Sequence, residues 1–135
     1  MKNNILMFLT PKEDTFYLKS DCTIRQVLEK LDYYKFSVVP LINDEGDYVT
    51  SVSEGDILRY IKNNASFSLK TAEDICVFDI PKYRPYEALS ILTPFDDLIK
   101  YSLEQNFVPV VDDRGKYIGI VKRRNIIDKL YLDKK

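Results

Sequence analysis

The chain has 135 residues, of which 45% are hydrophobic and 30% charged, a composition that is ordinary for a soluble globular protein. The 20 basic and 21 acidic side chains leave a net charge of −1, which argues against a nucleic-acid partner. The sequence contains no apolar run as long as the roughly 20 residues that a membrane-spanning helix needs, so we expect no membrane partner. Because the N-terminus lacks the features of a signal peptide, we expect a cytoplasmic location.

The sequence contains no histidine. This removes the commonest general base, the Ser-His and Cys-His nucleophile pairs and most transition-metal sites. The motifs GxGxxG and GxxxxGK are also absent from the sequence. We therefore expect no enzyme, no metal and no cofactor. Cys22 and Cys76 are isolated in the sequence, and we expect both thiols to be reduced and buried.

The first half of the chain predicts an apolar N-terminal arm, a hairpin and two helices. Apolar residues 5–9 of the arm, residues 1–15, are expected to pack on the core or on a partner. Thr23 and Gln26 have the spacing of a capping box at the start of a helix. The predicted elements are strand 16–18, a helix from residue 24 with Ile24, Val27, Leu28, Leu31 and Tyr34 on its apolar face, strand 38–42, turn 43–46, strand 48–52 and helix 54–63 with Ile57, Leu58 and Ile61 inward.

The second half of the chain predicts the same order of elements after a linker. Pro94 suits the first turn of a helix that Thr93 would cap. The predicted elements are linker 64–72, a helical turn at 72–75, an irregular segment at 77–86, strand 89–92, a helix with Leu98, Ile99 and Leu103 on its apolar face, strand 107–111, turn 112–115, strand 117–121 and helix 123–132.

An internal repeat gives residues 36–58 a second copy at residues 106–127, and the paired positions of the two copies differ by a constant 69. The offset pairs Pro40 with Pro109 and places a turn glycine in each copy. A unit of about 60 residues is marginal as an independent core. We therefore expect two copies, residues 1–64 and residues 65–135, that share one core.

The repeated hairpins resemble the second half of a CBS domain. Each has a Val-Pro strand, a glycine turn and a returning strand that ends in a [Ser/Thr]-x-x-[Asp/Asn] pattern at the head of a helix. The resemblance implies an α+β fold, a tandem CBS pair of two pseudo-symmetric βαββα repeats packed through their sheets. The chain is also similar to small stand-alone CBS-pair proteins of Gram-positive bacteria, some of which bind cyclic di-AMP, on the residues 79–82 and on Phe107-Val108.

The polar positions of the pattern differ between the copies. In the first copy Asp56 can accept both hydroxyl protons of a ribose, with Ser53 facing the same sugar or phosphate, but the two residues can equally form a helix cap. In the second copy Lys122 and Asn125 replace the serine and the aspartate. The basic run at residues 122–124 then predicts either a phosphate site or a solvated surface.

CBS pairs carry two clefts between the repeats that accept adenosine compounds. The resemblance implies adenine walls at the two Val-Pro pairs and backbone contacts from the segments before each first strand, with Arg84 as a further phosphate or partner contact. The implied ligand-binding residues are Thr15, Phe16, Ser37, Val39, Pro40, Ser53, Asp56, Ile80, Phe107, Val108, Pro109, Lys122, Arg123, Arg124 and Asn125.

These observations lead to two hypotheses for the function. The first is a regulatory sensor that binds AMP, ADP, ATP or cyclic di-AMP and acts in trans on a target protein. The second is a dimerisation or scaffold protein with vestigial clefts. The resemblance also implies a homodimer, formed through the exposed faces of the repeat helices with Tyr34, Tyr60, Tyr101 and Tyr131.

Overall fold

The structure is a computed structural model of the chain that describes residues 4–34, 37–64, 66–68 and 70–133. It divides into two compact units. Unit 1 comprises Met1–Thr15, Gly46–Tyr48 and Tyr86–Lys135, and unit 2 comprises Phe16–Glu45 and Val49–Pro85. The units are interleaved along the chain, whereas the expected boundary after residue 64 follows the sequence repeat.

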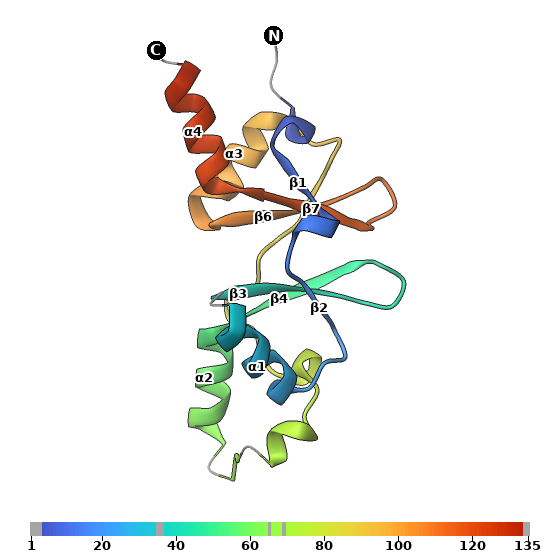
Figure 1. Cartoon of the computed structure of the whole chain (residues 1–135), viewed down its shortest axis with the longest axis vertical. Helices are drawn as coiled ribbons and strands as arrows, with labels where there is room; N and C mark the ends of the chain where they lie inside the picture. The colour runs from blue at the N-terminus through green and yellow to red at the C-terminus, as the bar shows by residue number, and fades with distance from the viewer. Residues whose placement is uncertain (1–3, 35–36, 65, 69, 134–135) are drawn as a thin grey trace. The chain divides into compact units, whose positions relative to one another are not determined.

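Unit 2 contains a three-stranded sheet with the strand order β2-β3-β4. The short strand β2 is parallel to β3, with Leu18 opposite Leu41 and Lys19 opposite Ile42. The elements are β2 (Leu18–Lys19), α1 (Ile24–Tyr34), β3 (Val38–Ile42), β4 (Tyr48–Ser53), α2 (Glu54–Asn63), and the 3-10 turns η3 (Thr71–Glu73) and η4 (Val77–Asp79) (Figure 1).

Unit 1 contains a four-stranded sheet with the strand order β1-β7-β6-β5. The strand β1 comes from the N-terminal arm and is antiparallel to β7. The elements are η1 (Ile5–Phe8), β1 (Leu9–Pro11), η2 (Lys12–Asp14), β5 (Leu89–Ser90), α3 (Phe95–Glu104), β6 (Phe107–Val111), β7 (Tyr117–Lys122) and α4 (Arg123–Asp133) (Figure 1).

The two units bury the same positions of the repeat. The hairpin and the closing helix keep the offset of 69, so that buried Val39, Leu41, Val52 and Ile57 correspond to buried Val108, Val110, Val121 and Ile126. The backbone repeats as well, because the N–H of Glu54 donates to the carbonyl of Ser37 at 2.9 Å and that of Arg123 to the carbonyl of Asn106 at 3.0 Å. The predicted internal repeat is therefore present in three dimensions.

The first half of the repeat has a different offset from the hairpin and the closing helix. Leu18 pairs with Leu41 in unit 2, and Leu89 pairs with Val110 in unit 1. The offset between the two first strands is therefore two positions larger than the offset of 69 between the two hairpins. The cause lies between the first helix and the central strand, because the stretch from the start of α1 to the start of β3 is longer than that from the start of α3 to the start of β6. The second repeat is thus shorter at this connection.

The N-terminal arm belongs to the core of unit 1. Ile5 and Phe8 are buried in that core, and the Phe8 ring stacks on Phe95 with 5.2 Å between the ring centroids. Leu6 and Met7 point away from it and are exposed. The prediction that apolar residues 5–9 pack on the core or on a partner is therefore confirmed for Ile5, Phe8 and the partly buried Leu9, which pack on the core.

The start of the first helix and the glycine turns of both hairpins were predicted correctly. Thr23 and Gln26 form the predicted capping box, with the Thr23 N–H donating to Gln26 Oε1 at 2.9 Å and the Gln26 N–H to Thr23 Oγ1 at 3.2 Å. The turn residues Gly46 and Gly115 have φ values of 89° and 82°, a region that favours glycine. Both hairpins and the two helices that follow them lie within a residue of their predicted bounds.

Other predictions were wrong in detail. Leu58 and Leu103, predicted to face inward, are 67% and 72% exposed. Pro94 is itself the cap residue of α3, without a side-chain cap bond, so Thr93 does not have the predicted role. The first strands are also shorter than predicted, Leu18–Lys19 and Leu89–Ser90, because only two residues of each pair with the central strand.

The two cysteines are free thiols, as predicted, but neither is fully buried. Cys76 Sγ lies 3.6 Å from the carbonyl oxygen of Ser20, to which it donates. Cys22 packs at the edge of the core of unit 2. The partial burial of Cys22 raises the pKa of its thiol, which keeps it protonated.

A few predicted positions lie outside the described residues. These are Phe36 in the first repeat, positions 65 and 69 of the linker, and the side chain of Tyr34. The remaining linker residues include a 3-10 turn with buried Ala72, which packs in the core of unit 2. Among the residues that the structure describes, no helix has the length and apolar character needed to cross a membrane.

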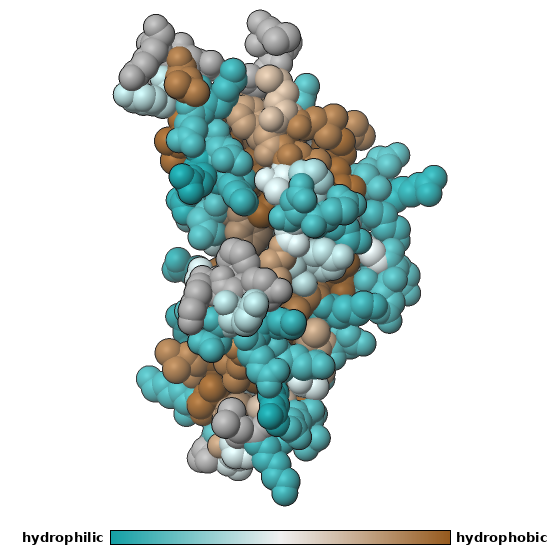
Figure 2. Space-filling model, in the orientation of Figure 1, coloured by the Kyte–Doolittle hydropathy of each residue, from teal (hydrophilic) through white to brown (hydrophobic). Residues whose placement is uncertain are grey.

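An apolar groove lies between α1 and α2 of unit 2. Its volume is about 340 Å³, and it is lined by Leu28, Leu31, Asp32, Glu54, Ile57, Leu58 and Ile61. On the face drawn in Figure 2, hydrophobic residues gather over α2, which is consistent with this groove.

A substitution at Gly119 would test the pairing of the N-terminal strand β1 with β7. Its φ is +152°, and a Cβ atom there would lie 2.1 Å from the carbonyl oxygen of Thr10 on β1. We predict that Gly119→Ala lowers the free energy of unfolding by about 2–4 kcal/mol, because β1 would have to separate from β7.

Gly115→Ala is the matched control for this prediction. Gly115 has a φ of +82°, and a Cβ atom added there would meet no atom within 4 Å, so the substitution introduces backbone strain without a clash. We expect it to cost about 1 kcal/mol. Urea denaturation of both variants measures the difference, and equal losses of stability would contradict the close approach of β1.

Candidate functional site

The start of α2 carries the polar pair that was singled out in the first repeat. The strand β4 ends at Ser53, and the helix begins at the next residue, so Asp56 lies at the third helical position. The Ser53 N–H donates to Asp56 Oδ2 at 3.0 Å, and the Asp56 N–H donates to Ser53 Oγ at 3.0 Å. Ser53 and Asp56 therefore form a reciprocal capping box, and the negative carboxylate lies at the positive end of the helix dipole.

Asp56 has a further partner from a distant part of the chain. Its Oδ1 atom accepts a hydrogen bond of 3.0 Å from the N–H of Tyr83. The residue is only 3% exposed although it carries a carboxylate. A buried carboxylate requires such donors, because desolvation without them would be costly. Each oxygen atom of Asp56 thus accepts one backbone hydrogen bond within unit 2.

A small pocket lies beside Asp56, between α2 and the segment at residues 81–83. Its volume is about 120 Å³, and it is lined by Asp56, Tyr60, Asn63, Asn64, Pro81 and Tyr83. Sites for drug-sized ligands usually measure about 300 Å³ or more. The pocket therefore has room for a fragment of a nucleotide and not for the whole molecule.

The other predicted residues of unit 2 lie in or beside its core. Val39 and Pro40 on β3 and Ile80 after η4 are buried, and Phe16 is partly buried against the same core. Ser37 is exposed, and its carbonyl accepts from the Glu54 N–H at the start of α2. Ser37, Ser53 and Asp56 are therefore brought to one end of α2, while the Val-Pro pair contributes to the packing of the sheet.

Pro40 and Pro109 occupy equivalent places in the central strands. Pro109 is opposite Ile120 on β7, and β5 pairs only with the next two residues, Val110 and Val111. A proline lacks the N–H needed for a continuous ladder. In each parallel pair the short first strand begins opposite the residue after the proline, so the proline lies outside that ladder and the central strand tolerates it.

The start of α4 in unit 1 is basic where the start of α2 is acidic. Lys122 and Arg124 are exposed, and Arg123 and Asn125 are partly buried. The Arg123 N–H donates to the carbonyl of Asn106. The structure thus places three cationic side chains at the N-terminal end of a helix, where the dipole adds to their positive potential.

The remaining predicted residues of unit 1 are held by partners of their own. The Thr15 hydroxyl bonds the Lys12 carbonyl at 2.8 Å and the Tyr117 hydroxyl at 2.9 Å. Val108 and Pro109 are buried on β6. Phe107 is partly buried and packs edge-on against Tyr86, with 4.8 Å between the ring centroids.

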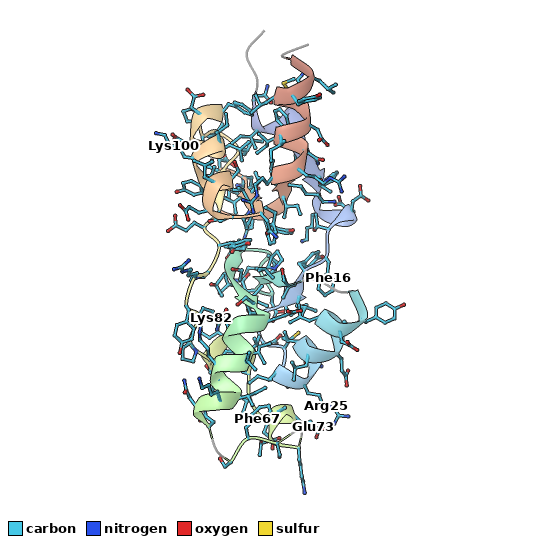
Figure 3. All side chains as sticks on the ribbon, turned by 90° about the vertical axis from the view of Figure 1, so that its left-hand side faces the viewer. Phe16, Arg25, Phe67, Glu73, Lys82 and Lys100 are labelled. Carbon is cyan, nitrogen blue, oxygen red and sulfur yellow. The ribbon has the colours of Figure 1, made fainter. Side chains whose placement is uncertain are left out.

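Sequence reasoning missed two contacts of the segment after η4. Lys82 donates from Nζ to the carbonyls of Val77 at 2.6 Å and Phe78 at 2.8 Å, beside α2 in Figure 3. Burial lowers the pKa of Lys82, although the negative charge of Asp56 acts in the opposite direction. The Arg59 guanidinium lies over the Tyr83 ring, 4.4 Å from its centroid. Pro81 and Pro85 lie in the stretch at residues 77–86 that the sequence predicted to be irregular, and no sequence signal indicated these contacts.

The protein-family comparison identifies the repeats. The CBS domain model matches residues 8–63 and 79–132, which together are most of the chain. The chain therefore belongs to the CBS domain family, as its hairpin motifs indicated. It contains two CBS repeats.

Relatives of the chain include plant and bacterial CBS proteins. CBSX1, a chloroplastic CBS domain-containing protein of Arabidopsis thaliana, is 26% identical over 145 residues, which cover 89% of this chain and 61% of that protein. The crystal structure of CBSX2 in complex with AMP is 27% identical with a TM-score of 0.75, and the match covers 98% of each chain. The chain spans between 22% and 61% of the length of the curated relatives that it matches.

A bacterial structure shows the same fold at lower identity. The structure of Listeria monocytogenes CbpB in complex with c-di-AMP matches with a TM-score of 0.84 and 19% identity, over 98% of this chain and all of that chain. The fold of this chain is therefore that of known CBS-pair structures.

The contacts of Asp56 predict its role in stability. We expect Asp56→Ala to lower the free energy of unfolding by about 2–3 kcal/mol, because two buried N–H donors lose their acceptor. Asp56→Asn should cost less, since one acceptor oxygen remains. Asp113→Ala is the control, because Asp113 is exposed in a hairpin turn. Chemical denaturation gives all three values, and a loss at Asp56 no larger than that at Asp113 would contradict the capping role.

Proposed function

We propose that the chain is a regulatory module that binds an adenosine-containing nucleotide and acts on a partner protein in trans. The proposed ligands are AMP, ADP, ATP or cyclic di-AMP. Binding would shift the population of the module's conformations, and the partner protein would recognise the change. The proposal is for binding without turnover.

The observation that carries this proposal is the carboxylate of Asp56 at the start of α2. The helix and the capping box hold it in one orientation, beside a pocket large enough for a nucleotide fragment. A carboxylate in this position can accept both hydroxyl protons of a ribose diol. Ser53, three residues earlier, presents a hydroxyl at the same helix end.

The relatives support an adenosine compound as the ligand class. CBSX2, which is 27% identical to this chain over nearly all of its length, has been crystallised with AMP. Structures of CbpB, which share the fold, contain c-di-AMP. Both ligands present adenine, ribose and phosphate, the three groups for which the predicted site residues were selected.

The start of α4 supports phosphate recognition in this proposal. Lys122 and Arg124 are exposed at the helix terminus, where backbone N–H groups and the helix dipole also favour an anion. Asn125 replaces the aspartate of the first repeat and removes a negative charge that would repel phosphate. The two repeats would then contribute different groups to ligand binding.

A panel of nucleotides tests the proposal. We expect at least one of AMP, ADP, ATP and cyclic di-AMP to raise the melting temperature by several degrees at concentrations well above its dissociation constant. Asp56→Asn should abolish that rise, whereas Asp113→Asn in the exposed turn should leave it unchanged. Thermal-shift measurements give the result, and a protein that none of the four compounds stabilises would refute the proposal.

The basic run makes a separate prediction. The double substitution Lys122→Gln and Arg124→Gln should weaken binding of ADP and ATP about tenfold and leave adenosine binding nearly unchanged, because only the phosphates carry charge. Lys100→Gln on α3 is the control for a lost positive charge, since Lys100 is also exposed. Calorimetry measures the affinities, and equal weakening of adenosine and ATP would rule out a phosphate role.

One observation favours a second candidate function. Both oxygens of Asp56 accept backbone hydrogen bonds within unit 2, and the second repeat lacks both the serine and the aspartate. A dimerisation or scaffold protein would use these groups for structure alone. Such a protein would show no stabilisation with any compound of the panel.

We further propose that the chain forms a homodimer in which a second copy covers the apolar groove between α1 and α2. The groove is apolar along α2, and Leu58 is exposed there. Tyr60 and Tyr101, also considered for this contact, are instead partly packed on the cores of their own units, and Tyr131 is exposed.

Light scattering tests the dimer. We expect the wild-type protein to have twice the chain mass at micromolar concentration, and Leu58→Asp to shift it to the monomer because a charge would be buried in the contact. Leu103→Asp, at an equally exposed leucine on α3, is the control. A wild-type monomer, or a dimer insensitive to Leu58→Asp, would contradict the proposed contact.

A further inference from the structure

We propose that residues 81–85, here called the strap, compete with the nucleotide for Asp56, so that binding requires the strap to move off the start of α2. The strap has the sequence Pro-Lys-Tyr-Arg-Pro. This inference rests on the proposed nucleotide function, and it adds an internal inhibitor to that function.

The strap occupies the carboxylate oxygen that a ribose would use. Oδ2 of Asp56 is committed to the cap of α2 through Ser53, and Oδ1 accepts from the Tyr83 N–H at 3.0 Å. With these contacts in place Asp56 is 3% exposed. A diol can approach Oδ1 only if the Tyr83 N–H withdraws, so the ligand hydroxyl and the strap compete for one acceptor.

Few contacts hold the strap, and most of them lie at the surface. Pro81, Tyr83, Arg84 and Pro85 are exposed. The Arg59 guanidinium lies over the Tyr83 ring. Lys82, labelled in Figure 3, donates to two carbonyls of η4. Segments with little buried surface open at a small free-energy cost. The strap therefore covers Asp56, and the free-energy cost of moving it off the start of α2 is small.

The prolines at both ends favour a strap that moves as a unit. Each proline fixes its own φ angle and restricts the residue before it, so the segment has few alternative conformations. The pocket of about 120 Å³ lies beneath the strap, lined by Pro81 and Tyr83 on one side and α2 on the other. Release of the strap would enlarge this pocket toward the volume that a nucleotide needs.

The strap leads directly into unit 1, so its release would affect that unit. It ends at Pro85, the last residue of unit 2, and unit 1 resumes at Tyr86. Tyr86 is anchored in unit 1 by its hydroxyl, which bonds Asn106 Oδ1 at 2.7 Å, and by its ring, which packs on Phe107. A displaced strap would therefore pull on a residue that unit 1 holds in place.

Weakening the strap tests the competition. Tyr83→Ala removes the contact with Arg59, and Lys82→Met removes the contacts with η4, while both keep the residues that contact ligand. If the strap covers Asp56 in most molecules, each variant should bind its nucleotide about three- to tenfold more tightly than wild type. The controls Tyr33→Ala on α1 and Lys100→Met on α3 make the same kinds of change at exposed side chains outside the strap and should change affinity less than twofold.

Calorimetry with AMP, ADP, ATP and cyclic di-AMP separates the outcomes. Tighter binding in both strap variants supports the competition. If the wild-type protein binds a nucleotide and the strap variants bind it with unchanged or weaker affinity, the proposed competition is overturned. The proposed nucleotide function is then unaffected. No binding of AMP, ADP, ATP or cyclic di-AMP to any of the proteins overturns both.

Trypsin gives a second test on the unmodified chain. The Lys82–Tyr83 bond is a trypsin site within the strap, whereas Arg84 is followed by Pro85 and resists cleavage. We expect saturating nucleotide to accelerate cleavage after Lys82 severalfold, because release exposes the bond. Protection of the bond by the nucleotide would overturn the proposal, even if a strap variant failed to fold.

Discussion

Each unit depends on one central strand whose apolar side chains must be buried. The central strands β3 and β6 lie between a short parallel strand and an antiparallel one, and Val39, Leu41, Val108 and Val110 are fully buried on them. The helices cover these strands because apolar residues in the middle of a sheet require cover. The returning strand runs directly into a helix, and this junction places the polar pair of each repeat at a helix start. The site is therefore a consequence of how the core is closed.

The same junction supports opposite electrostatics in the two repeats. At α2 a serine and an aspartate cap the helix, and a negative charge meets the positive end of the dipole. At α4 a lysine and two arginines stand in the corresponding place, so the dipole and the side chains have the same sign. The second arrangement is less favourable for an isolated helix, and it becomes favourable when an anion is present. The asymmetry supports the proposal that the two repeats contribute different groups to ligand binding.

The sequence predicted what is determined locally. The repeat, both hairpins and the capping box of Thr23 and Gln26 depend on spacings of a few residues, and all were predicted from the sequence. The cap formed by Ser53 and Asp56 was one of two alternatives that the sequence left open. The orientation of Leu58 and Leu103 could not be found in this way, since helical spacing does not reveal where an apolar face ends. The Tyr83 contact with Asp56 joins residues 27 positions apart. The change in offset between the first strands and the hairpins was not predicted, because each first strand has too few residues to define an alignment.

The N-terminal strand has a consequence for synthesis on the ribosome. The strand β1 emerges among the first residues of the chain, whereas its partner β7 lies close to the other end. At about 5–20 residues per second, several seconds pass before the pair can form. Residues 16–85 contain all of unit 2, so that unit can fold while unit 1 is still incomplete. During this interval Ile5 and Phe8 of the arm have no core of unit 1 to join.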